Sequence, residues 1–203
     1  MKIQRNILFA LAFMLSVNAF SQSSADAKKV LDKAAAVVGR RGGAAANFSI
    51  TGGEVGRTSG SIIIKGNKFK TITPEATIWF DGKTQWAYMK STNEVNVSTP
   101  SEAKRLSMNP YAFITMYKSG YRLSMKTTTD SYIVHLQAIH PARSMQEFYV
   151  TVSKAYYPQQ IKMLQGKKWV TINISNFRAA SQANSNFRFK HSDAPSAEVI
   201  DLR

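Results

Sequence analysis

The chain has 203 residues, with 27 Lys and Arg against 12 Asp and Glu, which gives a formal net charge of +15 at pH 7. It contains no cysteine, and this excludes disulfide bonds, cysteine-ligated metal sites and thiol nucleophiles. The length is sufficient for one domain with a conventional hydrophobic core. With no disulfide to stabilise it, the fold must depend on the burial of apolar side chains.

The first residues have the layout of a secretory signal peptide. Lys2 and Arg5 precede an apolar run over residues 7–17, which small residues follow. This run is shorter than the roughly 20 apolar residues that a membrane-spanning helix needs. We therefore predict a cleavable signal peptide over residues 1–21 and a single exported domain over residues 22–203. Without cysteine, the mature chain cannot carry a lipid anchor on that residue.

The segment after this signal, SADAKKVLDKAAAVVGRRGG, predicts an amphipathic helix that ends at Gly39. Its apolar residues recur at helical spacing: Val30, Leu31, Ala34, Val37 and Val38.

From Asn47 the apolar period changes to two, which predicts short antiparallel strands in a meander. The alternating pairs are Phe48 and Ile50, Ile62 and Ile64, Ile78 and Phe80, Trp86 and Tyr88, and Val95 and Val97. Strand alternation resumes at Tyr121 and continues through SYIVHLQAI, EFYVTVS, QQIKML and KKWVTINISNF, with an expected end near Phe187 and Phe189. An antiparallel sheet of more than about ten strands usually closes or curls.

Two helix starts interrupt the meander. Residues 99–102, Thr-Pro-Ser-Glu, form a capping box, and Asn109-Pro110 repeats the cap-plus-proline signal for a helix that Gly120 ends. We expect the apolar stripe of this second helix to face the concave side of the sheet. The stripe consists of Phe113, Met116 and Tyr117.

Asp81-Gly82 predicts a two-residue hairpin turn between two aromatic strands. In that turn Trp79 pairs with Thr84, so that Trp79, Trp86 and Tyr88 share one face of the sheet. The opposite face then holds Ile78, Phe80 and Gln85. Two interpretations of the aromatic cluster remain open: a packed core, or the wall of a cavity for an apolar ligand.

The sequence gives little support to catalysis. Its histidines, His135, His140 and His191, lack the spacing of zinc hydrolases, and we expect no metal, no cofactor and no enzymatic activity. A carboxylate pair among Glu75, Asp81, Glu94 and Glu147 is the remaining enzymatic alternative, because such pairs meet in space and not in sequence.

The basic excess is compatible with a solvated surface, anionic lipid headgroups or an acidic protein partner. The basic residues are scattered singly, without a recognition helix or an arginine-rich block, and we expect no nucleic-acid partner.

Several segments in order resemble the LolA-like outer-membrane lipoprotein carriers. The most specific is FDGKTQWAY, residues 80–88, which IIIKGNKF (62–69) precedes and NEVNVSTP and the Asn109-Pro110 helix start follow. EFYVTVS, QQIKML, WVTINISNF and NFRF also occur in the order of the family. The resemblance covers nearly the whole mature chain and implies a mainly β fold with a few α-helices: a curled, unclosed antiparallel barrel whose helices form a lid over the concave side.

The resemblance also implies a function: a monomeric periplasmic carrier that binds the acyl chains of lipoproteins and takes them from the inner to the outer membrane. Its implied partners are acylated lipoproteins, an inner-membrane release transporter and an outer-membrane receptor. The absence of cysteine favours the soluble carrier over the lipid-anchored receptor. A module that senses envelope lipids or lipoproteins with the same half-barrel is the alternative, and an enzyme that acts on an envelope polymer is a third.

Strand alternation and the lid stripe together predict which residues line the acyl-chain cavity. They are Ile62, Ile64, Trp79, Trp86, Tyr88, Phe113, Met116, Tyr117, Phe148, Val150, Ile161 and Met163.

Overall fold

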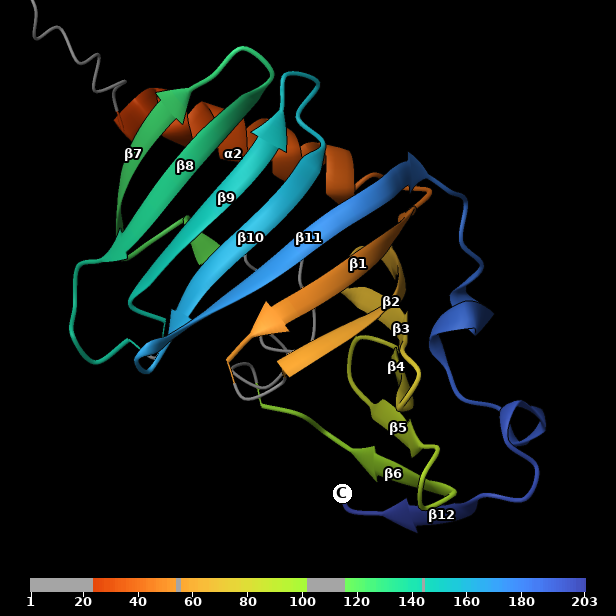
Figure 1. Cartoon of the computed structure of the whole chain (residues 1–203). Coiled ribbons are helices and arrows are strands. Elements are labelled where there is room, and N and C mark those ends of the chain that lie inside the picture. Colours follow the sequence, from red (N-terminus) through yellow and green to blue (C-terminus); the bar gives the residue numbers. More distant parts are fainter. Residues whose placement is uncertain (1–23, 54–55, 102–115, 144) are drawn as a thin grey trace, which may run out of the picture.

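A computed structural model describes residues 24–53, 56–101, 116–143 and 145–203 of the chain (Figure 1). Three sequence predictions lie outside these residues: the signal peptide, the helix start at Asn109-Pro110, and the position of Phe113. Thr99, Pro100 and Ser101 have no helical structure, and Glu102, which completes the predicted capping box, is also outside.

The predicted amphipathic helix is confirmed as α2 (Ser24–Val38), which ends directly before Gly39. Its buried side chains form one stripe: Ala27, Val30, Leu31, Ala34 and Val38. This stripe packs on strands β7 and β8, which anchors the helix to one end of the sheet. No helix in the described part of the chain is both long and apolar enough to cross a membrane.

The strands form one sheet. The first group is β1 (Ala44–Gly52), β2 (Gly56–Lys65), β3 (Lys68–Ile72), β4 (Ala76–Phe80), β5 (Gln85–Met89) and β6 (Glu94–Ser98). The second group is β7 (Tyr121–Thr127), β8 (Ser131–Ala138), β9 (Glu147–Ser153), β10 (Pro158–Gln165), β11 (Lys168–Ala179) and β12 (Glu198–Asp201).

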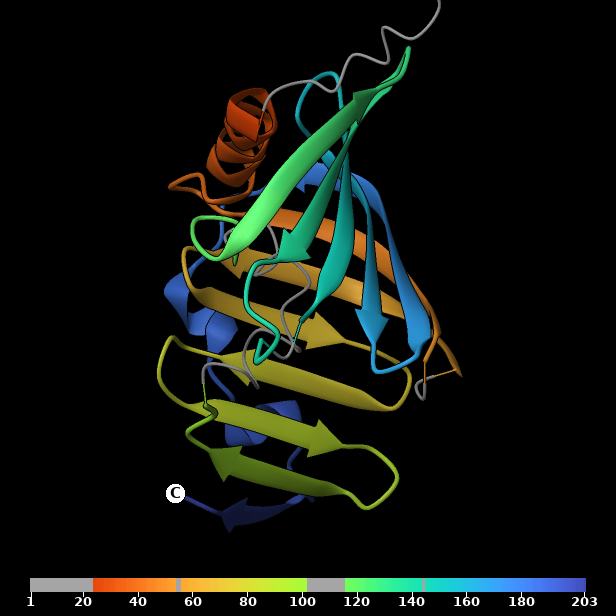
Figure 2. The same cartoon turned by 90° about the vertical axis from the view of Figure 1, so that its left-hand side faces the viewer.

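The order of strands in the 12-stranded sheet is β12-β6-β5-β4-β3-β2-β1-β11-β10-β9-β8-β7. Neighbours pair antiparallel, except that β12 lies parallel to β6. Strands β7 and β12 are the two edges, so the sheet curls without closing, as Figures 1 and 2 show. The predicted meander and the half-barrel fold are confirmed.

The register divides the sheet into a concave and an outer face. Paired residues in antiparallel strands project to the same side, so each pairing carries the face from strand to strand. Ile64 pairs with Phe69, and Phe69 pairs with Phe80. These three residues belong to the same buried cluster as the inner stripe of α2. The cluster therefore marks the concave face.

The hairpin between β4 and β5 differs from the predicted turn. Trp79 pairs with Trp86 and not with Thr84, and the last ladder pair is Phe80 with Gln85. The turn is thus centred on Gly82 and Lys83, with Gly82 at a φ of +104°. The Asp81 carboxylate fixes it by accepting the backbone N–H groups of Lys83 at 3.0 Å and Thr84 at 2.8 Å.

The C-terminal segment also differs from the prediction. Strand β11 ends at Ala179, and Phe187 belongs to a short 3-10 helix, η1 (Asn184–Phe187), instead of a strand. A second 3-10 helix, η2 (His191–Asp193), leads to the unpredicted strand β12. In Figure 2 this segment lies behind β3–β6, so it covers the outer face of the sheet.

Phe187 gives a test of this covering segment. Its ring is fully buried where η1 packs on β3 and β4, so Phe187→Ala should lower the free energy of unfolding by about 3–5 kcal/mol. Chemical denaturation measures the change. Ser185→Ala, at an exposed position of the same turn, is the matched control and should change it by less than about 0.5 kcal/mol. Equal effects of the two substitutions would contradict this packing.

Candidate functional site

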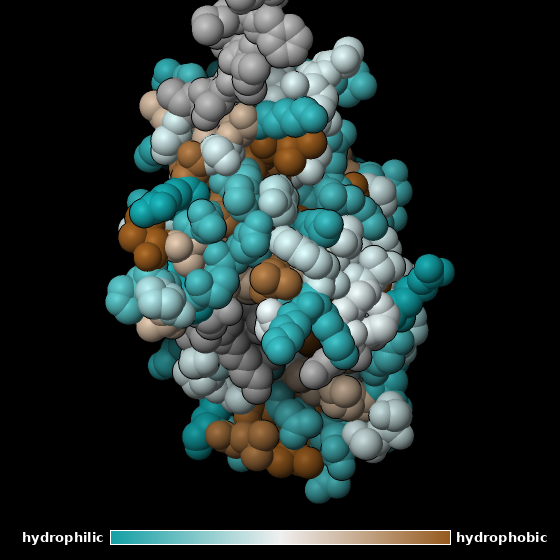
Figure 3. All heavy atoms as spheres, turned by 60° about the vertical axis from the view of Figure 1, so that its left-hand side comes forward, coloured by the Kyte–Doolittle hydropathy of each residue, from teal (hydrophilic) through white to brown (hydrophobic). Residues whose placement is uncertain are grey.

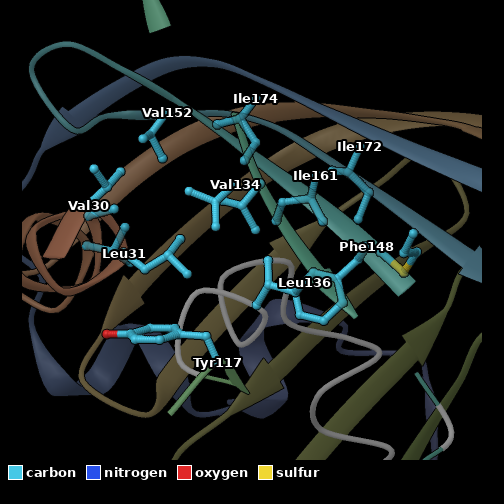
Figure 4. Packing of buried hydrophobic residues seen from close by; sticks show 14 of the residues in the cluster. Val30, Leu31, Tyr117, Val134, Leu136, Phe148, Val152, Ile161, Ile172 and Ile174 are labelled. Carbon is cyan, nitrogen blue, oxygen red and sulfur yellow. The ribbon is translucent and has the colours of Figure 1, made fainter. Parts of the chain in front are cut away.

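The concave face of the sheet is the largest continuous apolar surface inside the fold. Its centre lies on β8–β10, where Val134, Leu136, Phe148, Val150 and Ile161 have no accessible surface. In Figure 4 side chains from α2 and from β8–β11 point toward one another, with the Tyr117 ring nearby. The same cluster continues through β1 to β4, so the apolar lining extends over both halves of the sheet.

Most of the predicted cavity residues lie in this concave cluster. Those buried there are Ile62, Ile64, Tyr117, Phe148, Val150, Ile161 and Met163, and Met116 is partly buried against them. The alternation along three different strands, β2, β9 and β10, thus converges on one face. Whether these residues contact an acyl chain remains a prediction.

Trp79, Trp86 and Tyr88 are not on this face, and their predicted concave position is wrong. They share a face with one another, as predicted, but it is the outer face. Trp79 and Trp86 belong to a separate cluster, against which Tyr88 packs. The other buried members are Val95, Val97, Ala194 and Ala197. The true register is shifted by two residues from the predicted one, and an even shift leaves every side chain on its side.

The C-terminal segment explains why two tryptophans face outward. The Phe189 ring meets Trp79 edge-on with 5.5 Å between ring centroids, and the Lys70 ammonium lies 5.0 Å from the Trp79 centroid. The Arg188 guanidinium lies 5.6 Å from the Trp86 ring, within cation–π range. The contacts of Phe189 and Arg188 hold the C-terminal segment on the outer face of β4 and β5.

Hydrogen bonds also fasten this segment to the β5–β6 loop. The Tyr88 hydroxyl donates to Asn93 Oδ1 at 3.1 Å, and Asn93 Nδ2 donates to the backbone oxygen of Ser196 at 2.8 Å. Asn93 has a φ of +55°, which asparagine tolerates better than most residues. Tyr88 is therefore part of the connection to the C-terminal segment and not of the concave face.

The concave side of β4 and β5 instead carries Ile78, Phe80, Gln85 and Ala87, as their pairing requires. Phe80 and Gln85 are buried, and Ile78 and Ala87 are half-buried. At the end of β5, Met89 leaves 37% of its surface accessible. The face of the hairpin that the sequence analysis placed opposite the predicted cavity wall therefore extends the concave lining toward the sheet edge.

Most of the chain matches a known protein family. Residues 17–167 match the family described as "Outer membrane lipoprotein carrier protein LolA", which is more than half of the chain. This chain belongs to the LolA family. No curated protein matches it.

Solved structures with this fold have low sequence identity to the chain. An uncharacterised conserved protein from Thermus thermophilus has a TM-score of 0.59 at 12% identity, covering 87% of this chain and 99% of that chain. The LolA superfamily protein from Nitrosomonas europaea has a TM-score of 0.46 at 13% identity, with 80% and 97% covered. Lipoprotein LppX from Mycobacterium tuberculosis has a TM-score of 0.48 at 9% identity, and the match covers 79% of this chain and 99% of that chain. At 12% identity, the likeness to the Thermus thermophilus protein concerns the fold alone.

A polar contact at one rim of the LolA-type concave face joins α2 to Tyr117. The Tyr117 hydroxyl donates to Asp32 Oδ1, and Lys28 Nζ lies 2.7 Å from Asp32 Oδ2. These two donors, Lys28 first, lower the pKa of Asp32 below its ordinary value of 3.8. Burial, and then the Asp32 carboxylate, raise the pKa of Tyr117. The Tyr117 ring is thereby fixed against the apolar cluster.

His135 and Glu147, which the sequence offered only as an enzymatic alternative, lie away from the concave face. His135 Nε2 is 2.9 Å from Glu147 Oε1, and the His135 ring stacks on Tyr149 with 4.4 Å between centroids. His135 and Tyr149 pair across β8 and β9 on the outer face. Among the described residues, no three His, Asp or Glu side chains are grouped so that they could hold a metal ion.

The Asp32 contact predicts a specific dependence on pH. Its folded-state pKa is lower than its unfolded-state pKa, so the contact stabilises the fold above the unfolded-state pKa. This contribution is lost as the pH falls through the lowered folded-state pKa. Asp32→Asn should therefore be less stable than the natural chain at neutral pH, and the difference should shrink below a pH of about 4. Urea denaturation at a series of pH values measures it.

Tyr117→Phe is the companion variant, because it keeps the buried ring and removes only the donor. Losing this hydrogen bond should cost about 1 kcal/mol of unfolding free energy at neutral pH. The double variant should lose less than the sum of the two single variants, since both weaken the same contact. Additive losses, or an Asp32→Asn effect that is the same at pH 3 and pH 7, would contradict the contact.

Proposed function

We propose that this LolA-family chain is a periplasmic carrier that binds the acyl chains of lipoproteins and takes them from the inner to the outer membrane. The single observation that supports this most is the continuous apolar concave face of an unclosed sheet. Acyl chains cannot cross water unaided, because moving each methylene from an apolar environment into water costs about 0.8 kcal/mol. A carrier must therefore offer them an apolar surface that is shielded from water.

The unclosed sheet suits a carrier better than a closed barrel would. Because the edge strands β7 and β12 do not pair with each other, we propose that chains of different length and number enter and leave between them. The two ends of the concave face also differ, since α2 packs beside β7, whereas the end toward β12 carries the half-buried side chains of Ala87, Asn96 and Ser98 on β5 and β6. We propose that acyl chains enter along β4–β6.

In this proposal the protein acts by binding and does not transform its cargo. The membrane-side partners are an inner-membrane release transporter and an outer-membrane receptor, for which the scattered basic side chains provide a surface. The face in Figure 3 supports such contacts, since polar side chains cover most of it and hydrophobic ones form separate patches. One hydrophobic patch lies at the lower end, where β6 and β12 form the sheet edge.

Site-specific photo-crosslinking tests which face holds the cargo. Ala87 and Tyr88 are adjacent and both half-buried, but Ala87 projects to the concave face and Tyr88 to the outer face. A crosslinker at Ala87 should capture an acylated lipoprotein at least about tenfold more efficiently than one at Tyr88, because side chains alternate along a strand. Gel shift of the captured cargo measures both. Equal capture at the two positions would contradict binding on the concave face.

Lipid extraction and mass spectrometry of the protein from its native envelope test the carrier function itself. The expected result is bound acylated protein, or the acyl chains derived from it. Protein that is purified empty, and that does not take up a diacylated peptide in detergent-free buffer, would refute the proposal.

A further inference from the structure

Two buried polar atoms on the concave face have no hydrogen-bond partner among the described residues. They are Thr71 Oγ1 and Gln85 Oε1. The two side chains expose only 7% and 3% of their surface. Buried side-chain oxygens are normally paired, because an unpaired one loses its hydrogen bonds to water without replacement. The lack of a hydrogen-bond partner at each of these two atoms therefore requires a physical explanation.

The register places both side chains among apolar residues of the concave cluster. Thr71 pairs with Ile62 on one side and with Ile78 on the other. Gln85 pairs with Phe80, which belongs to the same cluster as Ile62. The two polar side chains thus flank strand β4, on strands β3 and β5, and project to the same side as the proposed acyl-binding surface.

Gln85 has a polar neighbour toward the sheet edge. It pairs with Ser98 of β6, and the next pair on the same face is Ala87 with Asn96. Ser98 and Asn96 are both half-buried. The centre of the concave face on β8–β10 is therefore apolar, whereas hydrogen-bonding groups are interspersed on β3, β5 and β6.

Another buried glutamine of the chain does have a hydrogen-bond partner for its side-chain oxygen. Gln182 is also buried, at 8% exposure, and its Oε1 accepts a hydrogen bond from Asn186 Nδ2 at 3.1 Å. Gln85, whose Oε1 has no partner, differs from Gln182 in that it projects to the proposed binding surface. An apolar residue of similar shape would fill the position of Gln85 without leaving an oxygen unpaired.

We propose that Gln85 Oε1 accepts a hydrogen bond from the polar group that adjoins the acyl chain of the ligand, and that Thr71 assists on the other side of β4. This inference rests on the proposed function and names its ligand class. The ligand is an acyl compound with an N–H or O–H donor at the head of the chain: an N-acyl amide, as on an acylated protein N-terminus, or a hydroxyl of an acylglycerol. A simple ester, which has no donor, lacks this recognition.

Three lauroyl compounds with one common chain serve as probes: N-methyl lauramide with an amide N–H, monolauroylglycerol with hydroxyls, and methyl laurate with no donor. We expect the natural chain to bind at least one donor-bearing probe about five- to tenfold more tightly than methyl laurate. The stronger of the two donor-bearing probes distinguishes the amide from the hydroxyl source. Displacement of a fluorescent fatty-acid analogue measures all three affinities.

Gln85→Met removes the acceptor and keeps an unbranched side chain of similar length. It should bring the donor-bearing probes to the affinity of methyl laurate and leave methyl laurate unchanged. It should also raise the thermal unfolding midpoint of the unliganded protein by about 2–4 °C, because an unpaired buried oxygen is removed. Gln137→Met, at an exposed position on β8, is the matched control and should change neither quantity.

Each outcome decides between distinct conclusions. If no lauroyl probe binds the natural chain, the proposed function and this inference both fail. If all three bind with equal affinity, or if Gln85→Met keeps the preference, acyl binding stands and the recognition by Gln85 is wrong. A lower unfolding midpoint in Gln85→Met would show that the glutamine stabilises the fold itself, and this would also overturn the inference.

Discussion

The pairing of β1 with β11 is the contact on which the rest of this structure depends. All other antiparallel neighbours follow one another in the chain, and each of them needs only a short connection. The β1–β11 ladder joins segments more than 100 residues apart, from the pair Ala44 and Ala179 to the pair Gly52 and Val170. Without it the chain would form two separate meanders, each with an exposed edge that favours aggregation.

This ladder also unites the two apolar surfaces. Phe48 pairs with Ile174 and Ile50 with Ile172, which continues one face of β2 onto β10. Close approach at the end of the ladder requires glycine at position 52, where φ is +93° and a Cβ atom would lie 2.2 Å from the Trp169 carbonyl oxygen. The concave lining is thus a consequence of one long-range pairing. Such non-local contacts are also expected to slow folding.

The two faces of β4 and β5 divide structural from binding requirements. On the outer face, Trp79 and Trp86 are covered by the C-terminal segment through aromatic and cation–π contacts. These contacts hold the two strands from the outer side of the sheet. This explains why the two tryptophans of the hairpin face away from the proposed ligand, while its inner positions hold Phe80, Ile78, Ala87 and the polar Gln85.

The sequence predicted the elements well, because their periods are local properties. The change from the helical spacing of Val30 and Leu31 to the alternation of Ile62 and Ile64 marked α2 and the strands. Alternation also identified which rings share a face, and a register error of two residues did not alter this. It cannot tell which of two apolar faces is concave. That choice depends on the C-terminal segment, whose contact residues Phe189, Ala194 and Ala197 follow no strand period.

The concave face becomes more polar from β8–β10 toward β5 and β6, so its two ends suit different parts of an amphiphile. At the centre of β8–β10, a ligand bound as proposed would meet apolar side chains, including Val134 and Val150. Near β5 and β6 it meets Gln85 and Ser98, which pair across the two strands. An amphiphile gains most when its chain lies toward α2 and its head lies toward β6, because the reverse orientation would place polar groups against hydrocarbon. Unpaired buried oxygens cost folding free energy, and such a cost is typical of binding sites.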